Sequence, residues 1–357
     1  MAAVFQANGL ATLIGSLPLT DHREATALIL DHMPEIPMWA QLPANRDEGM
    51  MAQFTPGLPG LNRRQDTMLV DLSGDSFDDE LLAFYEEYMA VSEGRIQLDD
   101  SRFALSEDTA RGFFIFLKQM GTTAVSPAGV KGQITGPFTF CTGIHDQDKR
   151  AIFYDPQVRD AAIKLLGLKA RWQAEQLLRF QKPVIIFFDE PALAGFGSSE
   201  FTSISREEAG QCLEEAFEPV HQVGGLTGVH VCANTDWSLV LDSSADIVSF
   251  DAYAYFDRFI LYADQVRAFL DSGRILAWGM VPTLNAEDLA KETTASLLHQ
   301  FKDKVKQIER LGIDVHRLIN QSLITPTCGT GTLSVDLAKK VLKITREMSQ
   351  EIRKRYA

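Results

Sequence analysis

His230 and Cys232 lie two positions apart in an apolar run that begins at Leu226. Side chains alternate along a β-strand, so an imidazole and a thiol at this spacing project from the same face. Such a pair supplies two of the four ligands of a tetrahedral zinc site. A second apolar run ends at Asp251, a further oxygen ligand, and Cys328 follows a third run far downstream. We therefore predict one zinc ion held by these four side chains.

Each of these patterns also has a structural explanation. A lone cysteine in an apolar segment is most often a small buried hydrophobic residue, which is the interpretation we prefer for Cys141 and Cys212. A carboxylate that follows a strand, such as Asp189 or Asp251, can instead cap the next helix. Cys328 differs, because it lies in TPTCGTGT, a turn of Thr and Gly rather than a core segment. This difference favours metal binding at Cys328.

The predicted ligand set indicates a particular chemistry. When zinc is bound by the two thiolates and the imidazole alone, a fourth coordination position stays open for a substrate. The two thiolates lower the Lewis acidity of the metal, which disfavours activation of water for hydrolysis. A thiol that binds such a metal is held as its anion at neutral pH, and a thiolate is a soft nucleophile toward a methyl carbon. The ligand set therefore predicts alkylation of sulfur.

Apolar strands that alternate with helices predict how these residues are positioned. Helices are expected between the strands, among them 78–91, 156–180, 259–272, 286–311 and 335–356. Eight segments are expected to be strands, with residues 10–17, 36–41, 130–135, 183–189, 226–232, a run ending at 251, 274–281 and 317–325. This alternation predicts an α/β fold, a (β/α)8 TIM barrel. We expect one domain over residues 1–357, with a large insertion at about 43–125 between strands two and three. A doubly wound open sheet is the alternative.

In a barrel of this kind, catalytic groups lie where the strands end, at their C-terminal side. The polar residues of interest all occur at such strand ends. They are Gly15, Ser16, Gln133, Thr135, Asp189, Glu190, His230, Cys232, Asp251 and Cys328.

Composition restricts the partners. The chain is 45% hydrophobic and 23% charged, values typical of a globular protein with a large core. Its net charge of −14 argues against nucleic acid or an anionic membrane as a partner. The sequence has no run of about 18 apolar residues and no basic segment before its first apolar stretch, so we expect neither a transmembrane helix nor a secretory signal. Four scattered cysteines favour a reducing, cytoplasmic location.

Five segments, in order along nearly the whole chain, resemble the cobalamin-independent methionine synthase family, specifically its C-terminal catalytic barrel. The wider superfamily includes uroporphyrinogen decarboxylase and corrinoid-dependent methyltransferases, and the present chain resembles a short, single-barrel member. The segments are ATLIGSLPLT (11–20), GQITGPFTF (132–140), FFDEPAL (187–193), HVC…ADIVSFD (230–251) and PTCGTGT (326–332).

The resemblance implies roles for the residues at the strand ends. His230, Cys232 and Cys328 take the zinc-ligand positions of the family. Asp251 takes the place of a glutamate ligand, either on the metal or behind its ligands.

The same resemblance implies a substrate site. Asp189 matches an aspartate that holds the amino-acid substrate, and Glu190 beside it is expected to assist in catalysis. The segment that contacts the substrate backbone corresponds to Ile14, Gly15 and Ser16.

The chain also departs from the family. The His-Gly-Glu element after strand two is replaced by Gln41-Leu42-Pro43-Ala44, and the histidine after strand seven is missing from WGMVPTL. The tryptophan that stacks on folate corresponds to Gly143. These departures favour a methylcorrinoid over a folate as the methyl donor.

The expected function is therefore that of a zinc-dependent methyltransferase acting on a small thiol, with methylcobalamin or a corrinoid protein as donor. The Met-rich loop 43–61 is the expected docking face for such a protein. One alternative is a metal-free enzyme like uroporphyrinogen decarboxylase, for which Arg46, Arg63 and Arg64 would bind carboxylates. The other is a non-catalytic accessory protein that binds a corrinoid or a metal.

Overall fold

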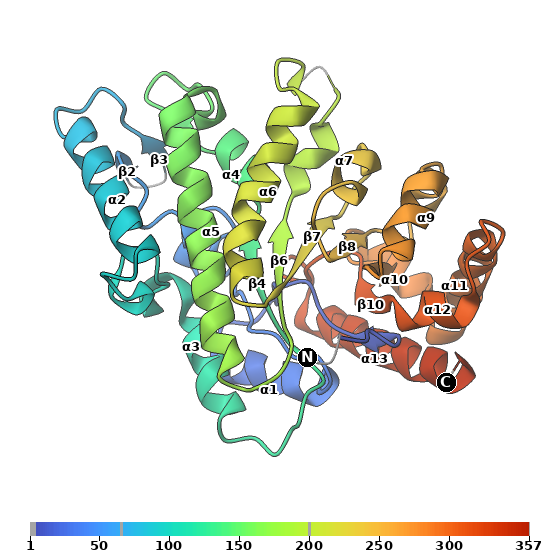
Figure 1. Ribbon diagram of the computed structural model, residues 1–357. Coiled ribbons are helices and arrows are strands. Elements are labelled where there is room, and N and C mark those ends of the chain that lie inside the picture. The colour runs from blue at the N-terminus through green and yellow to red at the C-terminus, as the bar shows by residue number, and fades with distance from the viewer. Residues whose placement is uncertain (1–4, 65–66, 199–200, 357) are drawn as a thin grey trace.

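A curled sheet of parallel strands forms the centre of the protein, seen in a computed structural model that describes residues 5–64, 67–198 and 201–356 (Figure 1). Its seven strands run in the order β1-β10-β9-β8-β7-β6-β4. They are β1 (Leu10–Ala11), β4 (Val130–Thr135), β6 (Val184–Asp189), β7 (Leu226–Val231), β8 (Ile247–Phe250), β9 (Ile275–Val281) and β10 (Ser322–Pro326). The mixed α/β architecture predicted from the sequence is therefore confirmed.

Helices connect these strands and cover the outer face of the sheet (Figure 1). Aspartate side chains cap two of them: Asp21 accepts hydrogen bonds from two backbone N–H groups of α1, and Asp155 does so for α5, which begins where the predicted helix 156–180 does. The helices are α1 (His22–His32), α2 (Phe77–Ser92), α3 (Glu107–Met120), α4 (Pro137–Gly143), α5 (Pro156–Leu178), α6 (Arg206–Gln222), α7 (Trp237–Leu241), α8 (Phe256–Phe259), α9 (Ala263–Asp271), α10 (Ala286–Lys291), α11 (Thr294–Glu309), α12 (Val315–Asn320) and α13 (Val335–Tyr356). None of the helices within the described residues is long and apolar enough to cross a membrane.

Several predicted elements differ from the structure. The predicted strand 317–325 is wrong in its first half, because the Asp314 carboxylate accepts a bond from the Arg317 N–H at 2.9 Å and starts α12 there. The predicted helix 286–311 is interrupted, since Thr293 and Ser296 form a capping box that starts α11 anew. The predicted helix 259–272 is likewise divided into α8 and α9.

The predicted strand 36–41 is present only as two isolated parallel bridges. Met38 pairs with Lys131 of β4, and Gln41 pairs with Ser16, just beyond β1. Pro37 has no N–H to donate, which limits a regular ladder here. The segment nevertheless lies between the two edges of the curled sheet. Seven of the eight predicted strands thus have regular strand structure, although only Leu10–Ala11 of the strand predicted at 10–17 forms it.

The region between this segment and β4 contains more structure than its sequence indicates. The expected loop 43–61 contains two turns of 3₁₀-helix, η1 (Arg46–Glu48) and η2 (Ala52–Phe54), and both Gln53 and Phe54 are fully buried. An antiparallel hairpin follows, β2 (Leu61–Arg64) and β3 (Thr67–Val70), and β3 pairs in parallel with β5 (His145–Asp146). The loop is therefore packed against the rest of the protein over its buried residues.

The interior of the curled sheet is apolar at one end and polar at the other. Ile185, Phe187 and Ile247 belong to one buried cluster inside the sheet. Further along the strands, Asp189 is in register with His230, and His230 is in register with Ser249. Neighbours in register on parallel strands share a face. The polar side chains are therefore gathered where the strands end.

Candidate metal centre and substrate pocket

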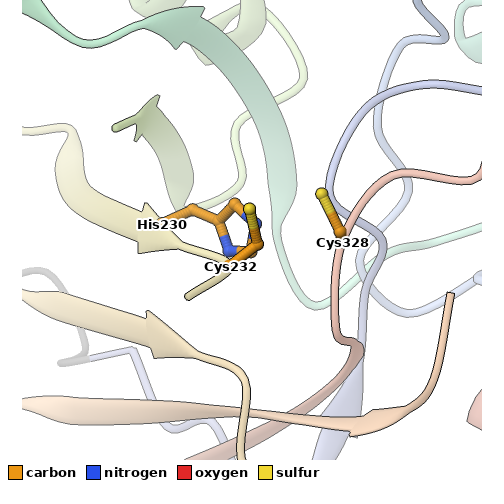
Figure 2. A group of neighbouring side chains, drawn as sticks. All are labelled: His230, Cys232 and Cys328. Carbon is orange, nitrogen blue, oxygen red and sulfur yellow. The ribbon is translucent and has the colours of Figure 1, made fainter. Parts of the chain in front are cut away.

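His230, Cys232 and Cys328 form one group of metal-ligating side chains. One ligand atom from each residue lies within 4.8 Å of the corresponding atoms of the other two. Figure 2 shows His230 and Cys232 projecting from the end of β7, with Cys328 facing them from a separate segment. Two thiols and an imidazole at this separation can hold a tetrahedral zinc ion. The structure therefore brings together three of the four predicted ligands.

The imidazole of His230 is oriented for metal binding by its neighbour on β8. Its Nδ1 lies 3.0 Å from the hydroxyl oxygen of Ser249, which is fully buried. Its Nε2 is also buried and has no hydrogen-bond partner among the described residues. Buried polar atoms without a partner are rare in folded proteins. We assign the proton to Nδ1, which donates it to Ser249, so that the lone pair of Nε2 is left for a metal.

The two cysteines of this group are free thiols that interact with each other. A hydrogen bond between them lowers the pKa of Cys232 and raises the pKa of Cys328. The His230 ring lowers the pKa of Cys232 further, against the effect of burial. Cys232 is therefore the more acidic of the two thiols, and a thiol must lose its proton to bind zinc.

A cavity of about 360 Å³ opens directly onto this group. All three metal-ligating side chains line it. So do the four residues predicted to bind the substrate, Ile14, Gly15, Ser16 and Asp189. No lysine or arginine of the described chain is among its lining residues. The predicted metal ligands and the predicted substrate residues therefore share one pocket.

Asp189 presents a buried acceptor to this cavity. It is 8% exposed, and its Oδ1 has no hydrogen-bond partner within the part of the chain that the structure describes. Burial raises the pKa of Asp189 to about 6, although His230 and the Lys131 ammonium act in the opposite direction. A ligand that brings a hydrogen-bond donor or a positive charge would stabilise this buried, unpartnered carboxylate most.

Glu190 faces another part of the protein. It is fully buried and does not line the cavity. Its two oxygens accept bonds from the N–H groups of Phe138 and Thr139 at 2.9 and 2.7 Å, at the N-terminus of α4, and from the Thr139 hydroxyl. Burial raises the pKa of Glu190 to about 7, and these hydrogen bonds oppose the shift. These contacts fix α4 to the end of β6, whereas the predicted catalytic role of Glu190 stays a prediction.

Asp251 lies outside the group of three ligands. Its Oδ1 accepts a hydrogen bond from the Ala254 N–H at 2.8 Å, in the turn that leads to α8. Burial raises the pKa of Asp251 to about 6, and the nearby Cys232 contributes to this shift. Asp251 is thus electrostatically coupled to the site while its carboxylate stabilises a turn. Its direct ligation of zinc stays a prediction.

The cavity wall also contains residues that no sequence pattern marks as part of the site. Gln41, Glu48 and Met50 reach it from the loop that was expected to be exposed. Glu48 is held by the His22 imidazole at 2.6 Å, and the Met50 carbonyl accepts a bond from the Thr135 hydroxyl at 2.5 Å. No short-range sequence pattern indicates these contacts, because they depend on how the loop folds back over the strand ends.

Strand alternation in the sequence also indicates two further residues of this face, Ser249 and Lys131. Ser249 stands two positions before Asp251, so strand alternation places both side chains on the face that carries the metal ligands. Lys131 stands two positions before Gln133 in the same way. Its buried ammonium donates to the Ile14 carbonyl at 2.5 Å and lies 4.5 Å from the centre of the Phe187 ring.

Comparisons with known proteins add no assignment. Neither the models of protein families nor the curated proteins that were searched match the chain. The resemblance to methionine synthases consequently depends on the five sequence segments alone. The site itself depends on the geometry of His230, Cys232 and Cys328.

Proposed function

We propose that the protein is a zinc-dependent methyltransferase that activates a small thiol, as a short member of the methionine synthase superfamily. The observation that carries this proposal is the group formed by His230, Cys232 and Cys328 at the wall of a cavity. With three protein ligands, a bound zinc keeps a position open for a substrate, as catalytic zinc sites do. Zinc in this ligand set would supply one thing, the stabilisation of an incoming thiol as its anion.

The residues of the pocket select and orient the acceptor. The unpartnered Oδ1 of Asp189 accepts a hydrogen bond from an ammonium group of the substrate, which favours an aminothiol. Ile14 and Pro191 contribute apolar surface to the cavity beside it. In the reaction, the sulfur–carbon bond forms as the methyl–cobalt bond breaks, the electron pair of that bond stays on cobalt, and the thiol proton leaves for solvent.

The methyl donor that we propose is a methylcorrinoid, either free or carried on a separate protein. Met50, which lines the cavity, is 38% exposed. An exposed, flexible thioether beside the pocket suits contact with a large apolar partner. The proposal extends to a cytoplasmic location, where thiols stay reduced.

The proposal also includes a complete barrel. The segment 36–41 is bridged to Lys131 of β4 on one side and to Ser16, beyond β1, on the other. A strand at this place would close the curled sheet into the eight-stranded barrel predicted from the sequence, interrupted by the insertion at 43–125. Closure would explain why polar side chains from both edges of the sheet reach the same cavity.

The decarboxylase alternative lacks the cations that it needs. Binding several carboxylates requires an arginine-rich cleft, yet no arginine of the described chain lines the cavity. Arg63 is engaged elsewhere, with its guanidinium 3.2 Å from the Asp47 carboxylate.

Metal content tests the site. Purified protein is expected to bind about one zinc per chain. Cys232→Ala and Cys328→Ala are each expected to lose the zinc, because the two ligands that remain are too few to hold the ion. Cys212→Ala is the matched control, since Cys212 is a buried free thiol that is not part of the metal-ligating group. Zinc retained in full by either ligand variant would refute the site.

A methyl-transfer assay tests the activity. Methylcobalamin is offered with cysteamine or with 2-mercaptoethanol, to the zinc-loaded and the zinc-free protein. We expect zinc-dependent formation of the thioether and a preference for cysteamine, whose ammonium can meet Asp189. Zinc binding with no transfer to any thiol would instead support the non-catalytic accessory protein.

A further inference from the structure

Cys328 reaches the metal group in a different way from the other two ligands. His230 lies in β7 and Cys232 directly follows it, so the strand pairing of β7 with β6 and β8 fixes their positions. Cys328 lies beyond the end of β10 at Pro326, in a turn rich in glycine and threonine. Loop residues need other contacts to be held in place with the accuracy that a zinc site requires.

One such contact anchors the residue before Cys328. The Thr327 N–H donates to the Val281 carbonyl at 2.9 Å, at the end of β9. The hydroxyl oxygen of Thr327 accepts the Thr283 N–H at 3.0 Å and lies 3.1 Å from the Thr283 hydroxyl oxygen. Both threonines are about 1% exposed. This side of the turn is therefore attached to the loop that follows β9.

A second set of contacts anchors the residues after Cys328, and all of them converge on Ser16. The carbonyl of Ser16 accepts the Thr330 N–H at 2.9 Å and the Thr330 hydroxyl at 3.0 Å. The hydroxyl oxygen of Ser16 accepts the Gly331 N–H at 3.2 Å. A Cβ atom at Gly329 would collide with the Ser16 hydroxyl, so the absence of a side chain there permits this close approach. Cys328 is thus held between two anchored neighbours.

We propose that Ser16 is a positioning residue of the metal centre, which holds Cys328 at the distance where its sulfur can share an ion with His230 and Cys232. The proposal rests on the zinc site proposed above and adds a role that substrate contact alone does not give Ser16. Ser16 also lines the cavity, so one residue joins the substrate wall to a metal ligand. Thr330 is its partner across the turn.

The test measures metal affinity rather than turnover. Zinc is competed against a chelator at fixed pH for the wild type, Ser16→Ala, Thr330→Val and Thr330→Ser. Ser16→Ala removes the bond from the Gly331 N–H, and Thr330→Val removes the bond from the Thr330 hydroxyl, so we expect each to weaken zinc binding about 10-fold, the lower end of the range for residues that orient a ligand. Thr330→Ser keeps the hydroxyl and is expected to keep the affinity of the wild type.

Thr345→Val is the matched control for loss of a buried hydroxyl. Its hydroxyl donates to the Val341 carbonyl within α13, at 2.8 Å, in a helix that provides none of the three ligands. Thermal unfolding of the metal-free proteins shows whether a variant is merely less stable. The absorption of the cobalt(II)-loaded proteins reports the thiolate ligands directly, and we expect weaker sulfur-to-cobalt bands for Ser16→Ala at equal protein concentration.

The outcomes separate this proposal from the proposed function. A wild type that binds no zinc overturns the metal site itself. A wild type that binds zinc, with Ser16→Ala and Thr330→Val binding it equally tightly, leaves the site intact and overturns the positioning role of Ser16. An equal loss in Thr345→Val would show a general effect of stability and would likewise overturn it.

Discussion

The orientation of the His230 ring depends on a single buried hydroxyl. Ser249 is the partner of Nδ1, and no described residue bonds to the buried Nε2. A histidine ligand whose other ring nitrogen is fixed presents its lone pair in one direction, which increases the affinity for the metal. Ser249 therefore orients the His230 ring, although serine is not itself a common zinc ligand.

We predict that Ser249→Ala lowers the zinc affinity about 10-fold or more, because the ring loses its acceptor for the Nδ1 proton. Chelator competition measures the change. Ser349→Ala is the matched control, since that buried hydroxyl donates to the Gly9 carbonyl at 2.6 Å in a different part of the fold. An unchanged zinc affinity in Ser249→Ala would show that packing alone orients the ring.

At the scale of elements, α6 is attached to the residue before β8 by an ion pair that depends on pH, and to β7 by a hydrogen bond. His221, in the last turn of the helix, lies 3.1 Å from the Asp246 carboxylate and 2.9 Å from the Thr227 hydroxyl oxygen. The hydrogen bond to Asp246 raises the pKa of His221, against the effect of burial, and Glu218 and Glu214 add to the shift. A positive charge at this position also interacts favourably with the C-terminus of the helix.

The pKa of His221 is raised in the folded state, so the imidazolium stabilises the folded protein. This contribution is fully present below the pKa of an unfolded histidine, about 6.5, and is lost as the pH rises through the higher folded value. We predict that the difference in unfolding free energy between wild type and His221→Gln is largest near pH 5 and shrinks toward pH 8. Chemical denaturation at several pH values measures it. His299→Gln is the control, because an exposed ion pair such as that of His299 with Asp303 contributes little to stability.

The sequence predicts elements well where local signals and the final fold agree. The predicted helix 156–180 begins at Pro156, where Asp155 caps it, and the near-continuous apolar segment 183–189 forms a buried strand. Prediction from the sequence fails where tertiary contacts determine the structure of a segment. At 36–41, for example, the segment forms isolated bridges rather than a regular strand. Prediction also fails where two local signals compete. The apolar run 317–325 resembles one strand, but the cap at Asp314 uses its first residues for a helix turn.

The candidate site was predictable for a related reason. His230 and Cys232 lie in and directly after one strand, so their spacing places them on one face, and Cys328 follows the end of another strand. Glu48 and Met50 could not be found in this way, because no periodic pattern describes a loop that folds over a cavity. Distances between segments far apart in the sequence come only from the assembled sheet.

At the scale of the whole molecule, a metal bound here would join parts of the chain about a hundred positions apart. His230 and Cys232 belong to the middle of the curled sheet, whereas Cys328 follows β10, which pairs with β1. Only the folded chain brings these ligands together. Binding therefore favours the folded state over the unfolded one.

We predict that removing zinc lowers the thermal midpoint of unfolding. At a free zinc concentration a thousandfold above the dissociation constant, the stabilisation amounts to about 4 kcal/mol. Calorimetry with and without chelator measures it, and Cys328→Ala is expected to show no difference between the two conditions. Cys212→Ala should respond to the chelator as the wild type does. A wild type with the same midpoint in both conditions would contradict the prediction.

The segment 36–41 forms a weakly paired line in the curled sheet, here called the seam. Its β-pairing with the flanking strands consists of two isolated bridges, whereas β6 and β7 are paired along five positions. Separation along this line therefore breaks fewer backbone hydrogen bonds than separation of β6 from β7. Gln41 marks the end of the seam at the cavity wall, on the side away from β7. A large ligand that enters by separating the segment 36–41 from its neighbours would therefore leave His230 and Cys232 in place.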